Sequence, residues 1–137
     1  LNNFNRMKRD FIHKNLTGNT AIELTSRNDS NNDFDIYSLL LANVHASDAV
    51  TFDLYLQKPN LILTPDRDVS FGEPIDFNVP TKTYTTIYLL KAINIDSGNT
   101  LVLDSNEIEY DSTVFDLYIK LNNSDSAVDI VINKKLN

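Results

Sequence analysis

The residues of this chain that could do chemistry are two histidines and a few paired carboxylates. His13 lies between Ile12 and Lys14 in a stretch typical of a strand, and His45 follows another such stretch. Neither histidine lies near a glycine-rich elbow or a recognisable nucleophile motif, which nucleophilic catalysis would need. The chain has no cysteine, so thiolate nucleophiles, thiolate metal sites and disulfide bonds are excluded. We therefore predict no catalytic residue and no enzymatic activity.

Two pairs of aspartates and one pair of glutamates stand two residues apart. They are Asp33 with Asp35, Asp66 with Asp68, and Glu107 with Glu109. The aspartate pairs offer hard oxygen ligands of the kind that bind calcium, but the glycine and the bidentate glutamate of an EF-hand loop are missing. The glutamates are expected to share a strand face, yet a glycosidase needs a sugar cleft, and the chain has no tryptophan to line one. We interpret all three pairs as solvated surface groups and predict no metal and no cofactor.

The charge distribution argues against nucleic acid as a partner. The net charge is −7 at pH 7, which disfavours binding to phosphates. The three glycines are isolated and form no loop that could cradle a phosphate. Basic residues cluster near the N-terminus, at Arg6, Lys8, Arg9 and Lys14. We expect this cluster to dock on an acidic neighbour; a nucleic-acid-binding arm is the alternative.

The composition favours a single all-β domain. At 137 residues the chain is long enough to bury a core without disulfides or metals. It has 15 Asp against 4 Glu, together with 18 Asn, and these residues favour turns and caps over helix interiors. The longest apolar run, residues 39–42, is far short of the ~20 residues of a membrane span, and no leader sequence opens the chain. We expect no membrane partner.

Short apolar runs, each followed by a polar cluster, predict about eight strands. Strands are expected at residues 11–16, 21–24, 34–44, 50–57, 84–93, 100–103, 114–121 and 127–132. This spacing is typical of an antiparallel β-sandwich, either jelly-roll or immunoglobulin-like. The run at 34–44 is apolar on both parities, which indicates a strand buried on both faces or central in a sandwich. The sequence Phe-Asp-Leu-Tyr-Leu at residues 52–56 is almost repeated as Phe-Asp-Leu-Tyr-Ile at residues 115–119. This indicates either a duplicated half-sandwich or the fact that β-strands use few residue types.

Two segments fall outside this rhythm. Residues 1–9 have no clear period and are interpreted as an N-terminal arm on a sandwich domain spanning 10–137. Residues 58–82 contain all four prolines, Pro59, Pro65, Pro74 and Pro80, and are interpreted as a long loop with a short strand at Leu61–Leu63. Loops of this length are uncommon unless they are functional, so the segment is a candidate contact surface.

Several stretches carry a family resemblance. They are residues 14–22, 36–43, 49–56, 86–92, 95–103 and 116–119. In order they give a buried strand ending in Ala-Asn, a Ser-Asp turn, an alternating strand, a tyrosine-bearing strand and a Leu-Val-Leu strand. Over roughly residues 10–135 the chain resembles small β-sandwich structural proteins of the virions of tailed bacteriophages, particularly those of marine cyanobacteria.

The resemblance implies a non-enzymatic component of the virion, either a capsid decoration protein or an accessory protein of the neck or tail. Its implied partners are other virion proteins of the capsid, neck or tail, and copies of itself. Such proteins act through repeated contacts between subunits. The residues expected to make these contacts lie in the arm and the long loop: Phe4, Arg6, Met7, Lys8, Arg9, Leu61, Ile62, Phe71 and Phe77. The alternative is a β-sandwich module that binds carbohydrate or a host receptor.

Overall fold

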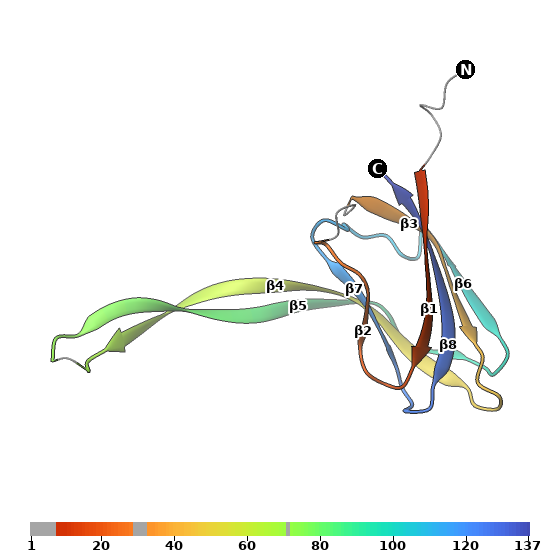
Figure 1. Ribbon diagram of the computed structural model, residues 1–137, viewed down its shortest axis with the longest axis horizontal. Coiled ribbons are helices and arrows are strands. Elements are labelled where there is room, and N and C mark those ends of the chain that lie inside the picture. Colours follow the sequence, from red (N-terminus) through yellow and green to blue (C-terminus); the bar gives the residue numbers. More distant parts are fainter. Residues whose placement is uncertain (1–7, 29–32, 71) are drawn as a thin grey trace, which may run out of the picture.

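The protein is built from eight β-strands (Figure 1). The computed structural model describes residues 8–28, 33–70 and 72–137, and none of these residues is helical. The strands are β1 (Lys8–Thr17), β2 (Ile22–Thr25), β3 (Phe34–Asn43), β4 (Val50–Asp68), β5 (Ile75–Ile95), β6 (Thr100–Asp104), β7 (Asp116–Leu121) and β8 (Ala127–Leu136). The prediction of an all-β chain with about eight strands is confirmed. Glu107 and Glu109 lie in the connection between β6 and β7, so the expectation that they share a strand face is wrong.

The strands form two antiparallel four-stranded sheets with the orders β1-β8-β3-β6 and β2-β7-β4-β5. The first strand pairs with the last, the second with the seventh, the third with the sixth and the fourth with the fifth. A long hairpin rolled up on itself gives this pairing, and the arrangement is that of a jelly roll. Of the two sandwich types that the strand spacing left open, the immunoglobulin-like order does not occur here.

Alternating apolar side chains from both sheets fill the space between the layers. On β4, Val50, Phe52, Leu54 and Leu56 are buried, whereas the residues between them face outward. On β8 the residues of one parity, from Val128 onward, are buried in the same way. This period of two is what a strand with one covered face requires. The central strands therefore follow the alternation predicted for residues 50–57.

A β-bulge explains why β3 is apolar on both parities. The register of β3 with β8 shifts between Ile36 and Ser38, so Tyr37 is the extra residue. Phe34 and Ile36 face the core before the bulge, and Leu39 faces it after the bulge. A bulge changes the parity of the core-facing side chains because it adds one residue. β3 is an inner strand of its sheet, between β8 and β6. Its outward-facing residues are half-buried or exposed, and none of the described strands covers them, so the expectation of a strand buried on both faces is wrong.

Two further irregularities lie on β5, where the register with β4 shifts on both sides of Leu54. Ala92 lies in the first of these bulges with φ of 53°, and it is the one non-glycine residue with positive φ in the described parts of the chain. The backbone N–H of Ala92 donates a hydrogen bond of 2.8 Å to Oδ1 of Asp53. This hydrogen bond compensates part of the strain of the left-handed conformation.

We expect the substitution Ala92→Gly to raise the free energy of unfolding by roughly 1 kcal/mol, because glycine adopts positive φ without a Cβ clash. The matched control is Ala42→Gly on β3, where φ is not positive and the loss of conformational restriction should destabilise by about 0.5–1 kcal/mol. Urea unfolding of both variants would check the prediction. Destabilisation of both variants by the same amount would contradict it.

Candidate interaction surface

Strands β4 and β5 run far beyond the sandwich as a two-stranded ribbon. Pairing of β4 with β7 ends at Gln57, and from Lys58 to Asp68 strand β4 pairs with β5 alone. Figure 1 shows this ribbon projecting away from both sheets. The prediction of an excursion at residues 58–82 holds in position, but the prediction of a long loop with a short strand at 61–63 is wrong. Residues 58–68 and 75–82 are β-strand, and of the residues described between them 69, 70 and 72–74 are outside the strands.

The positions of the prolines explain how a proline-rich segment forms a ribbon. Within the ribbon Pro59 pairs with Tyr84, Pro80 with Leu63, and Pro65 with Asn78. These three pairs have the same parity, and opposite residues of an antiparallel pair alternate between hydrogen-bonded and non-hydrogen-bonded. At non-hydrogen-bonded positions the N–H points away from the partner strand, so proline loses no ladder hydrogen bond there. All three prolines therefore fit the ribbon without breaking it.

One face of the ribbon carries two exposed leucines, and we call it the leucine face. It consists of Pro59, Leu61, Leu63 and Pro65 from β4, and of Asn78, Pro80, Lys82 and Tyr84 from β5. The ammonium of Lys82, the direct partner of Leu61, lies 5.8 Å from the centre of the Tyr84 ring. Leu61 is 71% exposed and Leu63 is 57% exposed, which is unusual for leucine in a folded protein. The opposite face is also partly apolar, with Ile62, Ile75, Phe77 and Val79 among several threonines. Because a two-stranded ribbon has no layer to pack against, its apolar side chains stay in solvent until another surface covers them.

The far end of the ribbon is acidic. Asp66, Asp68, Glu73 and Asp76 lie there beside the single cation Arg67. Nε of Arg67 lies 2.9 Å from Oδ1 of Asp76, its direct partner across the ribbon. Hydrogen bonds from the hydroxyl and the backbone N–H of Ser70 lower the pKa of Asp68, so this carboxylate stays charged. The ribbon thus ends in a tip with net charge −3.

The residues predicted to make contacts fall into three groups. Phe4, Arg6, Met7 and Phe71 lie outside the described residues. Lys8 and Arg9, expected in the arm, belong instead to β1, and the guanidinium of Arg9 lies 4.7 Å from the centre of the Tyr37 ring. Leu61, Ile62 and Phe77 are exposed on the ribbon, where a contact surface was predicted.

Several other exposed apolar residues were not predicted from the sequence. These are Leu63, Ile75 and Tyr84 on the ribbon, and Phe11 and Val102 on the sandwich. Two stretches of the ribbon have a composition typical of strands: the threonine-rich residues 81–86 and the run Leu61–Leu63. The prolines between them normally argue against a strand.

A row of tyrosines crosses the outer face of the sheet β2-β7-β4-β5. Tyr118, Tyr55 and Tyr88 are direct partners on three neighbouring strands, and Glu23 of β2 continues the row. The rings of Tyr55 and Tyr118 stack with centroids 5.5 Å apart and an interplanar angle of 10°. The ammonium of Lys91 lies 4.1 Å from the centre of the Tyr88 ring. The rings therefore cover one another, and the row stabilises the sheet as cross-strand pairs do.

The end of the row perturbs the ionisation of Tyr118. Partial burial, a 3.1 Å hydrogen bond from its hydroxyl to Glu23 and the charge of that carboxylate raise the pKa of Tyr118 from 10.0 to about 12. In the unfolded chain Tyr118 has its ordinary pKa of 10.0, so it loses its hydroxyl proton at a lower pH than in the folded protein. We therefore expect the free energy of unfolding contributed by Tyr118 to be lost as the pH rises from 10 to 12.

The difference in ultraviolet absorbance between the wild-type protein and Tyr118→Phe should titrate near pH 12, and Glu23→Gln should lower that midpoint. A midpoint at the ordinary value of tyrosine would contradict the hydrogen bond.

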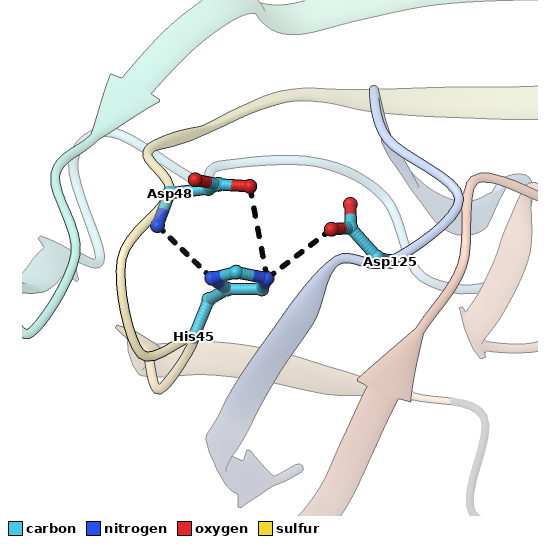
Figure 2. A group of neighbouring side chains, drawn as sticks. All are labelled: His45, Asp48 and Asp125. Atoms are coloured by element: carbon cyan, nitrogen blue, oxygen red, sulfur yellow. Dashed lines mark hydrogen bonds and ion pairs between the residues drawn. The ribbon is translucent and has the colours of Figure 1, made fainter.

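A cluster of His45, Asp48 and Asp125 joins two loops at one end of the sandwich (Figure 2). Nδ1 of His45 accepts hydrogen bonds from the backbone N–H groups of Ser47 (3.1 Å) and Asp48 (2.9 Å). Nε2 lies 3.3 Å from a carboxylate oxygen of Asp125 and 3.8 Å from one of Asp48. Because Nδ1 accepts two hydrogen bonds, the neutral imidazole carries its proton on Nε2. This N–H donates a hydrogen bond to the carboxylate of Asp125. The histidine thus ties the β3–β4 turn to the β7–β8 turn.

Within the described parts of the chain this cluster is the one group of three such side chains close enough to share a metal ion. A metal on Nε2 would require the proton on Nδ1, where two N–H donors already point. The geometry therefore fits a hydrogen-bonded turn better than a metal site. We expect Zn²⁺ or Ca²⁺ to leave the melting temperature unchanged relative to EDTA, since a bound ion would raise it. A rise with Zn²⁺ that His45→Ala abolishes would contradict this.

Two open hollows lie on the described surface. One of about 300 Å³ is bounded by Asp35, Tyr37, Glu109 and Lys135. The other, of about 420 Å³, lies beside the tyrosine row at the Ala92 bulge, and its polar lining groups are Asn19, Thr51, Asp53, Lys91, Lys120 and Asn122. Ser105, Asn106 and Tyr110 also line the first hollow.

Comparison with known proteins gives no assignment. No protein-family model matches the chain, and no curated protein matches it. Within the described residues no helix is long and apolar enough to cross a membrane.

Proposed function

We propose that the chain is a non-enzymatic structural protein of a bacteriophage virion, which uses its projecting ribbon to grip neighbouring proteins. Capsid decoration and an accessory role in the neck or tail are the forms of this function that the sequence resemblance implies. The single observation that carries the proposal is the ribbon, which exposes Leu61 and Leu63 far from the chain's own core. Exposed apolar surface of this extent is typical of a site that another protein covers.

Two further features support a role in contacts. The ribbon makes no core for itself, so its apolar side chains become buried only by intermolecular packing. No other described strand pairs with the outer edges of the ribbon from Lys58 to Asp68. Pro59, Pro65 and Pro80 leave these edges without an N–H at their positions, which disfavours the addition of another strand, so we expect contacts through the side chains of the ribbon's faces. A sandwich that carries a protruding ribbon suits an assembly in which one contact is repeated between many copies.

The alternative is a module that binds carbohydrate or a host receptor. The hollow beside the tyrosine row, with Asp53, Lys91 and Lys120 among its lining residues, favours it. Sugar-binding platforms use the open face of an aromatic ring, but Tyr55 is stacked against Tyr118, and Tyr88 is covered by Lys91. The tyrosine row therefore fits a structural role better, and we expect no saturable binding of this protein to a glycan array.

The proposal is tested by asking whether the chain is part of purified particles. Phage carrying the gene is grown with the natural chain and with a variant in which Asn-Gly replaces residues 61–82. Asn60 and Thr83 are direct partners at a hydrogen-bonded position of the ribbon. A two-residue hairpin turn needs such a pair on either side of it, so Asn-Gly can join these two residues. The variant therefore shortens the ribbon without touching the sandwich.

After density-gradient purification, an antibody against the chain should detect the natural chain on particles in constant ratio to the capsid protein. The shortened chain should remain in the soluble fraction while keeping the circular dichroism spectrum of a folded β-protein. Complete absence of the natural chain from particles would overturn the proposal. Equal incorporation of both chains would show that the ribbon is not the contact element.

A further inference from the structure

Strand β1 is the outermost strand of its sheet, and it is regular along its whole length. Its register with β8 runs without a shift from Lys8 to Thr17, and these residues include no proline. The outermost strands at the other sheet ends are short or irregular: β2 has four residues and a register shift, β6 has five residues, and β5 has two bulges and Pro80. Short strands, bulges and prolines protect a sheet edge from pairing with another chain. Of the four outermost strands, β1 is therefore the one best suited to accept another strand.

The main-chain groups that face outward from β1 belong to its odd-numbered residues. The N–H of Gly18, just beyond the strand, donates to the carbonyl oxygen of Ser126, just before β8. The N–H of Phe11 donates instead to Oδ1 of the preceding residue, Asp10, at 2.9 Å. Main-chain groups of successive residues point to opposite sides of a strand. The even-numbered residues therefore bond to β8, and the odd-numbered ones from Phe11 to Asn15 present N–H and C=O groups to the open edge.

The sequence of β1 is complementary to itself in one antiparallel register. A two-fold axis at Ile12 places Asp10 opposite Lys14 of the second copy, and Lys14 opposite Asp10 of the second copy. It also places Phe11 opposite His13 of the second copy, and His13 opposite its Phe11. Opposite charges and aromatic pairs that face each other across two strands stabilise their pairing. The charged residues, which would otherwise keep other strands away from this edge, thus favour a second copy of the same strand.

The two faces of β1 are consistent with this register. Ile12 is half-buried and packs against the core, so Asp10 and Lys14, two residues away on either side, share its core-facing side of the strand. Phe11 and His13 lie on the outer side, where their rings meet edge-on at 6.3 Å within one copy. Each pair across the two-fold axis therefore joins residues of the same face, and the core-facing sides of both copies lie on the same side of the joined sheet.

The adjacent registers lack this complementarity. An axis at Phe11 places Asp10 opposite Ile12, and an axis at His13 places Asp10 opposite Leu16. With the axis at Ile12, the outward N–H and C=O groups of Phe11 and His13 form hydrogen-bonded pairs. Asp10 and Lys14 then form non-hydrogen-bonded pairs, in which side chains lie closer together. Both residues are exposed within one copy, so each is accessible to the other chain.

We propose that two copies of the chain pair antiparallel through β1 about a two-fold axis at Ile12. The sheets β1-β8-β3-β6 of the two copies then join into one continuous sheet of eight strands. The partner is a second copy because the main-chain groups, charges and rings at this edge complement the same strand. Such a two-fold contact closes on itself and gives a dimer. The inference goes beyond the proposed function, because it rests on β1 and not on the ribbon.

Exchange of the two charges tests the register. In a dimer of Asp10→Lys chains both ion pairs become pairs of cations, and in a dimer of Lys14→Asp chains both become pairs of anions. Like charges directly opposite each other are destabilising. Each variant alone should therefore be monomeric in light scattering at concentrations at which the wild-type protein is a dimer. An equimolar mixture of the two restores both ion pairs, so it should form a dimer that contains one chain of each kind.

The matched control is Lys120→Asp, which reverses an exposed charge on β7 in the other sheet and should leave the wild-type dimer intact. A mixture that remains monomeric while both variants keep the wild-type melting temperature overturns the inference. Dimerisation of either variant alone, to the same extent as the wild-type protein, overturns it as well. So does a wild-type protein that is monomeric at every concentration measured.

A disulfide test does not depend on the folding of the charge variants. The chain has no cysteine, so an introduced cysteine is unique. Ile12→Cys lies opposite its own copy at a non-hydrogen-bonded position, where Cα atoms about 4.5 Å apart permit a disulfide. Mild oxidation should therefore link two Ile12→Cys chains.

Phe11→Cys is the control for random collision. Phe11 is 55% exposed, more than Ile12, but it lies opposite His13 and not opposite itself. Its disulfide dimer should form more slowly than that of Ile12→Cys. Equal or faster linkage of Phe11→Cys would overturn the inference, because it indicates another register or collision alone. Failure in any of these experiments leaves the role of the ribbon in particles untouched, since the particle experiment measures that role separately.

Discussion

Replacement of Leu54 by alanine is expected to lower the free energy of unfolding by about 2–5 kcal/mol, the cost of a cavity in a close-packed core. Leu54 is 0% exposed and lies between the sheets on the central strand β4. Its neighbour across the strand pair, Ile119 of β7, is also fully buried, so the surrounding side chains have little freedom to fill the space. Urea unfolding followed by circular dichroism gives the value.

The same strand supplies the control. Leu61 lies seven residues further along β4 and is 71% exposed on the ribbon, so Leu61→Ala should change the unfolding free energy by less than about 0.5 kcal/mol. Leu117→Ala on β7, at 0% exposure, should behave like Leu54→Ala. Similar costs at Leu54 and Leu61 would contradict the description of β4 as half core strand and half free ribbon.

Replacement of Asn43 by alanine is expected to cost about 2–4 kcal/mol, because it leaves several backbone groups without partners inside the protein. Asn43 is 1% exposed at the end of β3. Its amide nitrogen donates to the carbonyl oxygens of Asp48 and Ile95, both at 2.9 Å, and its Oδ1 accepts the N–H of His45 at 3.0 Å. This one side chain therefore holds the β3–β4 turn against the end of β5.

The control for this prediction is Asn123→Ala, at an exposed turn between β7 and β8, with an expected effect below about 0.5 kcal/mol. Thermal unfolding of both variants checks the difference. If Asn43→Ala melts at the wild-type temperature, water replaces the amide without loss and the loops at this end are held by other contacts.

Much of the architecture follows from the period of two and from the polar turns. The alternation at 50–57 predicted a strand with one buried face, and β4 buries Val50, Phe52, Leu54 and Leu56 there. The choice between jelly roll and immunoglobulin-like order did not follow, because strand spacing is similar in both and the order depends on long-range pairing. The mixed parity of residues 34–44 was explained only by the bulge at Tyr37, which a sequence pattern does not mark.

The excursion at residues 58–82 was predicted in position but not in form. The exposed Leu61, Ile62 and Phe77 lie where a functional excursion was expected. The prolines hid its β-structure, since their fit depends on the register of two strands that are paired only in the folded chain. The row of His13, Val131, Leu40 and Val102 across the other sheet had no sequence signal at all, because its members come from four strands and are neighbours only through the sheet order.

Hydrogen exchange of the ribbon amides, measured with and without assembly, tests the central claim most directly. In the dilute protein the amides of residues 58–68 and 75–85 should exchange rapidly, while those of β3 and β8 are protected. On assembly with its partner the ribbon should gain strong protection, and the protection of the core strands should not change. A ribbon that is already protected in the isolated monomer, or that exchanges equally fast before and after assembly, would contradict the account.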